Sequence, residues 1–208
     1  MKRVLAMLGS GRMFQRGYSM LLRIAALITA IGGAVFWILT WRVIAELERF
    51  YAYYYRAGSR IAPAGIMFQI LMVVLIYCLV HTLLIRARTV EELQPTDYII
   101  TPLFSVTLKL LGEISACLFI FSGLAGGLSI WIAGGNILGP LGISSISLGT
   151  NDFIGGLLTM LLGLLLAFAS LVTFYYLSEV AIVLVDIATN TRSLRDDAGS
   201  NEQENRAG

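Results

Sequence analysis

Four apolar stretches, each of about 20 residues or more, constrain the fold of this 208-residue chain more than any other feature. They are Leu21–Trp41, Ile66–Ile85, Ile114–Ala133 and Phe153–Leu177. At a rise of about 1.5 Å per residue, a helix of this length crosses a hydrocarbon core of about 30 Å. Within these stretches only Arg23 and His81 can carry charge, and both lie near an end. The stretches therefore predict four membrane-spanning helices.

The composition favours the same class. Hydrophobic residues make up 57% of the chain and charged residues 13%, about half the charged share of a soluble domain. A soluble protein of this size could not hide so much apolar surface. We therefore expect an all-α polytopic membrane protein, with its four transmembrane helices arranged as two helical hairpins in a lipid bilayer. The net charge of +2 comes without a dense basic cluster, so no nucleic-acid partner is predicted.

The distribution of basic residues predicts the orientation. If both termini are cytoplasmic, eleven of the 15 basic residues lie on the cytoplasmic side. These eleven are Lys2, Arg3, Arg12, Arg16, Arg23, Arg86, Arg88, Lys109, Arg192, Arg195 and Arg206. The first external connection keeps four arginines and the second, Gly134–Asp152, has none. The positive-inside bias therefore favours N-in and C-in.

The spans divide the chain into five parts. Residues 1–19 alternate basic and apolar side chains, which predicts a basic amphipathic cytoplasmic segment held at anionic headgroups. Residues 20–88 form the first hairpin, whose start reads as a retained signal anchor because its apolar run is too long for a signal peptide. Residues 89–113 are a cytoplasmic connection with an amphipathic approach helix. Residues 114–192 form the second hairpin with a cytoplasmic helical extension, and residues 193–208 are predicted to be a disordered polar tail.

The two external connections differ in character. Trp41–Arg60 is rich in aromatic residues, as expected where a helix passes through the headgroups, and a docking face for a partner or pigment is the alternative. Gly134–Asp152 is glycine-rich and almost uncharged. It is predicted to lie in the interface or to fold back as a re-entrant turn, which would have to be shielded by protein.

Small residues recur at helical spacing within the spans. They are Ala26, Ala30 and Ala34 in the first, Gly123 and Gly127 in the third, and Thr159, Gly163 and Ala167 in the fourth. Small side chains let helix backbones approach closely in a membrane. Packing within the chain is the favoured interpretation, and contact with a second copy or another subunit is the alternative.

Four ionisable residues are expected at one depth, near the cytoplasmic ends of the spans: His81, Lys109, Glu113 and Glu179. Ionisable groups at the membrane are functional candidates, so a proton or cation relay through His81 with Glu113 or Glu179 is one hypothesis. The favoured interpretation is an interfacial ring of charges, in which Lys109 and Glu113 form an i,i+4 pair. Beyond this depth, Glu179, Asp186 and Asn190 recur on one helix face and predict a docking face.

No pattern predicts an enzyme. One histidine and two separated cysteines, Cys78 and Cys117, cannot build a zinc site of three or four ligands. The chain has no phosphate-binding loop, metalloprotease or haem-attachment motif. Neither a catalytic residue nor a cofactor is therefore predicted, and the cysteines are interpreted as packing residues.

The segment of about Thr101–Arg192 resembles an uncharacterised bacterial membrane family, domain of unknown function four-two-eight-two. The residues that carry the resemblance are the entry Ile100-Thr101-Pro102-Leu103, the glycine-rich Gly123–Gly127, the run Gly155-Gly156-Leu157-Leu158, and the exit from Glu179 through Asp186 to Asn190. The resemblance implies a hairpin in the bacterial cytoplasmic (inner) membrane and no particular chemistry.

The predicted function is structural. The spans combine small-residue packing motifs with a midplane free of charge, which favours a non-enzymatic accessory or scaffold subunit that packs against other membrane proteins or itself. The alternative is a small channel or transporter, possibly homo-oligomeric, with a proton or cation path at its cytoplasmic side. A transporter usually places charge or a broken helix near the midplane.

Overall fold

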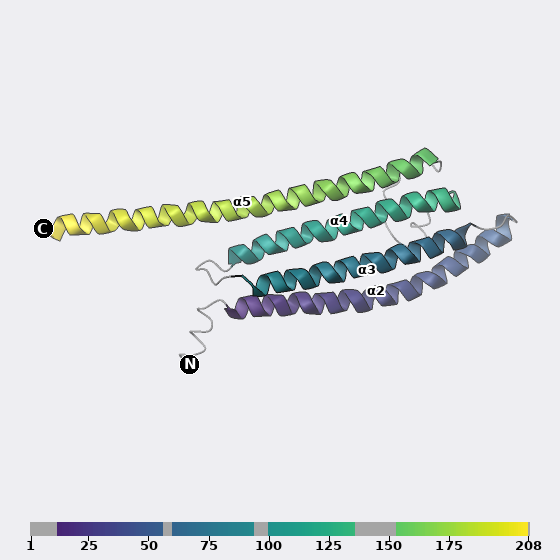
Figure 1. The fold of residues 1–208 in the computed structure, drawn as a ribbon, viewed down its shortest axis with the longest axis horizontal. Helices are drawn as coiled ribbons and strands as arrows, with labels where there is room; N and C mark the ends of the chain where they lie inside the picture. Colours follow the sequence, from purple (N-terminus) through teal and green to yellow (C-terminus); the bar gives the residue numbers. More distant parts are fainter. Residues whose placement is uncertain (1–11, 56–59, 94–99, 136–152, 208) are drawn as a thin grey trace.

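Four long helices make up the computed structural model, which describes residues 12–55, 60–93, 100–135 and 153–207 (Figure 1). They are α2 (Arg12–Tyr55), α3 (Ile61–Glu91), α4 (Ile100–Ala133) and α5 (Phe153–Ala207). Each is long and apolar enough to cross a membrane. The predicted class of a helical, multi-pass membrane protein is therefore confirmed. Most of the glycine-rich outer connection and of segment 1–19 lies outside the described residues.

The helices lie side by side in chain order, and successive helices run in opposite directions (Figure 1). α2 packs on α3, α3 on α4, and α4 on α5. In the most apolar part of α4, 44% of the residues are buried, against 11% in α2 and 17% in α5. The helices therefore form an open row with α2 and α5 at its edges.

Two apolar clusters hold α2, α3 and α4 together. One surrounds Phe68 of α3, whose ring lies 5.6 Å from that of Phe121 of α4, centroid to centroid. The other joins Leu22 and Ala26 of α2 to Leu83 and other residues of α3 and α4. Lipid tails are as apolar as these side chains, so close van der Waals packing, rather than removal of apolar surface from water, stabilises both clusters.

The helices extend beyond the predicted spans. α2 continues past Trp41 to Tyr55, as its aromatic end predicts. α3 continues six residues past Ile85 to Glu91, because that segment contains neither glycine nor proline. α4 begins at Ile100, so the amphipathic approach and the third span form one continuous helix.

The last segment differs from its prediction. The structure continues α5 to Ala207, whereas the composition of residues 193–208 predicts a disordered tail. Residues such as Glu202, Gln203 and Ala207 are good helix formers, and no proline interrupts the segment. Helix continuation therefore needs only local backbone hydrogen bonds, which a prediction based on buried apolar surface does not consider.

Candidate functional site

Polar side chains link neighbouring helices at the end of the row where α2 and α4 begin. We call the ionised and hydroxyl groups at the centre of this region the polar layer; it consists of Ser19, Arg23, Arg86, Glu91, Glu113 and Tyr175. These side chains come from all four helices. The layer lies near the ends of the predicted spans.

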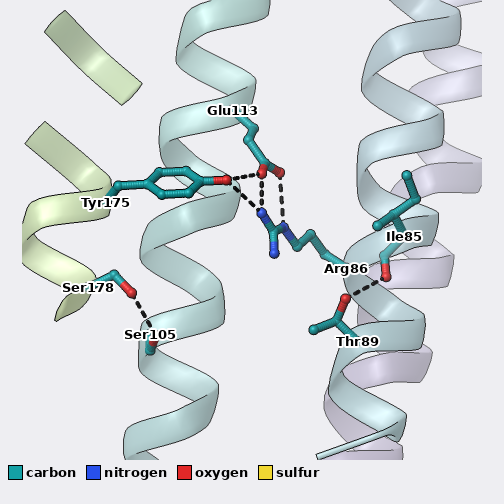
Figure 2. A network of polar contacts seen from close by, with 7 residues as sticks. All are labelled: Ile85, Arg86, Thr89, Ser105, Glu113, Tyr175 and Ser178. Carbon is teal, nitrogen blue, oxygen red and sulfur yellow. Dashed lines mark hydrogen bonds and ion pairs between the residues drawn. The ribbon is translucent and has the colours of Figure 1, made fainter. Parts of the chain in front are cut away.

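Arg86 of α3, Glu113 of α4 and Tyr175 of α5 form the main cluster of this layer (Figure 2). The Arg86 Nε donates to Glu113 Oε2 at 2.9 Å, and Nη2 donates to Glu113 Oε1. Nη2 also donates to the Tyr175 hydroxyl at 3.0 Å, and that hydroxyl donates to Glu113 Oε1 at 2.7 Å. Three helices are thus joined by one bidentate ion pair and one phenol.

This pair is largely removed from solvent, since the side chains of Arg86 and Glu113 are only 15% and 22% exposed. Charge-assisted bidentate bonds are among the strongest polar contacts in proteins. At the edge of the hydrocarbon, a charge must be paired or reach the headgroups. Removing either side chain would therefore leave the charge of the other without a partner.

A second, exposed ion pair joins α2 to α3. Arg23 Nη2 lies 2.8 Å from Glu91 Oε2, and the Ser19 hydroxyl donates to Glu91 Oε1 at 2.7 Å. The two charged side chains are 53% and 42% exposed. Water and salt screen such a pair, so we expect it to contribute only about 0–1 kcal/mol to the stability of the fold.

Hydroxyl pairs add further links at the same end. Tyr18 of α2 and Thr107 of α4 lie 2.6 Å apart, oxygen to oxygen. The hydroxyls of Ser105 in α4 and Ser178 in α5 are also 2.6 Å apart, and both residues are buried (Figure 2). This end of the row is therefore joined by side-chain hydrogen bonds as well as by packing.

The structure brings together only part of the predicted ionisable cluster. Glu113 pairs with Arg86 rather than with Lys109, whose Nζ lies 5.7 Å from the centroid of the Tyr175 ring. His81 is exposed and stacks on Tyr77, with ring centroids 5.6 Å apart. Glu179 is exposed one turn beyond Tyr175. Among the described residues neither His81 nor Glu179 is hydrogen-bonded to Glu113, and the relay stays a prediction.

The glycines of the third and fourth spans lie in the α4–α5 contact. A Cβ added to Gly123 would come within 2.8 Å of the Gly163 Cα, and one added to Gly127 within 2.5 Å of the Gly156 carbonyl oxygen. Thr159 and Ala167 are also buried, at 0% and 3% exposure. Only glycine lets the two backbones approach this closely.

The alanine stripe of the first span is only partly placed in a contact. Ala26 is buried, Ala30 is half-buried and Ala34 is exposed, so burial within the chain follows only part of the stripe, and contact of Ala34 with a second copy or another subunit stays a prediction. Steps of four residues advance by about 400° and drift around the helix. The contact follows a 3.5-residue period instead, and Gly33 takes the inner place against the side chain of Ile76.

The predicted docking face on α5 has apolar neighbours. Glu179, Asp186 and Asn190 are all exposed, and Asp186 also borders a cavity between α3, α4 and α5. The exposed apolar residues beside them are Ile182, Val183, Leu184 and Ile187, at 40%, 54%, 61% and 57%. The exposed surface of this segment therefore combines apolar side chains with acidic and polar ones.

The opposite end of the row is organised by aromatic side chains. Trp37 and Trp41 of α2 contact each other edge to face, and the Thr40 hydroxyl accepts a hydrogen bond from Gln69 of α3 at 2.7 Å. Trp131 of α4 stacks on the ring of Phe153 of α5 and donates to its backbone oxygen at 2.9 Å. The Trp131–Phe153 contacts hold the end of α4 against the start of α5.

Sequence reasoning did not identify Arg86, Tyr175 or Gly156 as site residues. The sequence marks Arg86 only as one of the cytoplasmic basic residues after the second span, although its uninterrupted helical context indicates that α3 continues. Tyr175 lies within the predicted fourth span and carries no charge, so it is not among the ionisable candidates. Gly156 forms part of the same spacing as Thr159 and Gly163, which was a readable signal for the contact stripe.

Among the described residues there is no group of three or more histidine, cysteine, aspartate or glutamate side chains that could hold a metal ion. Comparisons with protein-family models, curated proteins and solved structures find no match to this chain. The resemblance to domain of unknown function four-two-eight-two therefore stays a prediction, and the function has to be inferred from the geometry of the chain itself.

Proposed function

We propose that this protein is a non-enzymatic accessory or scaffold subunit of a membrane assembly, docking through the part of α5 that extends beyond the polar layer. The observation that carries the proposal is the exposed apolar surface of that part, formed by Val183, Leu184 and Ile187. Apolar side chains that lie beyond the lipid and outside a packed core favour a protein partner.

The depth of these residues supports the proposal. Ile182 to Ile187 follow Tyr175 by seven to twelve residues, which places them about 10–18 Å further along the helix axis. Headgroups extend only about 5–8 Å beyond the hydrocarbon on each side. If Tyr175 and its partners mark the hydrocarbon edge, Val183, Leu184 and Ile187 lie past the headgroups.

The proposed orientation places both termini in the cytoplasm of a bacterial cell, with the polar layer at the inner face of the cytoplasmic membrane. The positive-inside bias supports this orientation, since Arg16, Arg23, Arg86, Arg88 and Lys109 lie at the polar-layer end of the row. Reporter fusions after residue 208 and within residues 136–152 test it. A cytoplasmic signal from both positions would contradict it.

The docking proposal is tested by the size of the complex extracted in mild detergent. We expect the wild-type protein to migrate in a complex larger than a monomer, and the double variant Leu184→Gln/Ile187→Gln to migrate as a folded monomer. The matched control is Thr191→Gln, an exposed polar position on the same helix, which should keep the complex. A wild-type protein that is strictly monomeric would contradict the scaffold function.

The alternative function, a small and possibly homo-oligomeric channel or transporter, has one supporting observation. The Arg86–Glu113 pair is a poorly exposed charged group at the proposed cytoplasmic ends of the spans. Proteoliposome flux separates the two functions. Proton or cation conductance that is lost in Glu113→Gln, while the protein remains folded, would favour the alternative.

A further inference from the structure

A cavity of about 440 Å³ lies between α3, α4 and α5, directly beside the polar layer. Its wall combines two cationic side chains, Arg86 and Lys109, with the hydroxyls of Thr89 and Ser105 and with apolar side chains of α4 and α5. Asp186 borders it from α5. Small-molecule sites in proteins have this size and this mixture of an apolar wall with a few converging polar groups.

Lys109 has no carboxylate partner within 4 Å in the described part of the chain, although it is half-buried. Its contact with the face of the Tyr175 ring compensates the ammonium only weakly. A partly buried cation is costly to leave without an anion. The cavity is thus a place where an anionic group would be stabilised.

Arg86 can contribute a second donor to the same anion. Glu113 and Tyr175 occupy its Nε and Nη2, and Figure 2 shows the remaining nitrogen, Nη1, directed away from Glu113. A guanidinium and an ammonium on one wall suit the oxygens of a phosphate group. Ser105 is engaged with Ser178, so its hydroxyl is a weaker candidate.

The depth of Lys109 favours a lipid as the source of the phosphate. Lys109 lies one helical turn before Glu113, which is about 6 Å from the hydrocarbon edge marked by the ion pair. Lipid phosphates occupy this depth, and basic pockets between transmembrane helices at the cytoplasmic side bind anionic headgroups. The apolar residues Val106, Ile182 and Val185 complete the wall further from the hydrocarbon edge than Lys109, on the side where a lipid headgroup would lie.

From these observations we propose that the cavity between α3, α4 and α5 binds the headgroup phosphate of an anionic phospholipid, with Lys109 as its main ligand and Arg86 as the second. This proposal does not depend on the scaffold function. In this proposal Lys109, the one lysine among the described residues, binds a lipid phosphate instead of a carboxylate of the chain. The pair Arg86–Glu113 then both joins the helices and presents one nitrogen to the lipid.

The binding test uses the full chain, delipidated in detergent and titrated with phosphatidylglycerol or with phosphatidylcholine, with bound lipid counted by native mass spectrometry. We expect tighter retention of phosphatidylglycerol, and about five-fold weaker retention in Lys109→Gln, the change expected for losing one basic residue near lipid phosphates. Lys109→Arg should retain binding. The matched control is Arg88→Gln, an exposed cation outside the cavity, which should bind as the wild type does.

Three results would overturn the proposal. Equal retention of the two lipids would remove the preference for an anion. An equal loss in Lys109→Gln and Arg88→Gln would show that only general surface charge matters. If millimolar inorganic phosphate or glycerol 3-phosphate displaced the lipid from the wild-type protein, the cavity would be a site for soluble phosphates instead.

A second measurement does not depend on a variant that folds. The chain has only two lysines, Lys2 and Lys109, so an amine-reactive reagent reports on Lys109 with Lys2 as the internal reference. We expect phosphatidylglycerol to slow the labelling of Lys109 at least five-fold relative to Lys2, whereas phosphatidylcholine should not. Equal labelling of Lys109 in both lipids would contradict the proposed site.

Discussion

Arg86 and Glu113 illustrate how a residue's surroundings decide what its charge contributes. The two ion pairs of the polar layer differ in exposure: Arg86 and Glu113 are 15% and 22% exposed, whereas Arg23 and Glu91 are 53% and 42% exposed. Removing one partner from a poorly exposed pair leaves a charge without compensation. The same change in an exposed pair returns a charge to water.

We therefore expect Glu113→Gln to destabilise the protein by about 1–3 kcal/mol, below the usual cost for a fully buried pair because the pair keeps some exposure. Arg23→Gln should cost about 0–1 kcal/mol. Reversible unfolding of the purified protein in mixed micelles measures both changes. Equal costs for the two substitutions would contradict the difference inferred from exposure.

At the scale of the helices, two contact stripes have different periods. In α2 the buried residues Ser19, Leu22, Ala26 and Thr40 follow a 3.5-residue period, which favours a left-handed crossing with α3. In α5 the buried residues Gly156, Ala167 and Ser178 recur every eleven residues, close to the natural period of a helix. α4 and α5 can therefore stay in contact over a long distance, from Trp131 and Phe153 to Ser105 and Ser178.

The close contact between α4 and α5 predicts the effect of alanine at its glycines. Gly123→Ala or Gly163→Ala places a Cβ against backbone atoms at 2.6–2.8 Å, so the helices must separate. We expect a loss of about 1–3 kcal/mol from such overpacking. Gly32→Ala is the control, because nothing lies within 4 Å of its added Cβ, and it should be neutral or stabilise by up to about 1 kcal/mol. The same unfolding assay measures all three, and stable Gly123→Ala and Gly163→Ala proteins would contradict the contact.

The sequence predicts the helical elements better than their ends or partners. Hydropathy follows the hydrocarbon depth, so it locates the spans, and the second predicted span ends at Ile85. The helix continues from Arg86 to Glu91, because its backbone hydrogen bonds are satisfied within the helix whether or not lipid surrounds it. The partner of Glu113 depends on which helix lies beside α4, and no local pattern encodes that. The contact at Gly123, Gly127 and Gly163 could be predicted, because a missing side chain permits close approach of the backbones whichever helix lies opposite.

At the scale of the whole molecule, the row is open. α4 has neighbours on two sides, whereas α2 and α5 expose long apolar faces, such as Leu27 at 60% and Phe168 at 67%. In a bilayer such faces meet lipid or another protein. An open row thus provides two lateral surfaces for the assembly proposed above, whereas a closed bundle would bury part of both.

Disulfide crosslinking distinguishes an open row from a closed bundle. In a background of Cys78→Ala and Cys117→Ala, we expect Ser105→Cys/Ser178→Cys to form an intramolecular disulfide, because the serine oxygens are 2.6 Å apart. Leu27→Cys/Phe168→Cys should form none within a monomer, since those side chains lie on the exposed faces of the two edge helices. A disulfide inside the monomer from the second pair would show that α2 and α5 close on each other.

The aromatic end of the row has an optical consequence. All three tryptophans of the chain, Trp37, Trp41 and Trp131, lie at the end opposite the polar layer. The tryptophan fluorescence of the protein therefore originates in one leaflet, next to the outer connections in the proposed orientation. The other leaflet, where the ion pairs and the lipid cavity lie, contributes no indole emission, so the protein carries a built-in spectroscopic label for one side of the membrane.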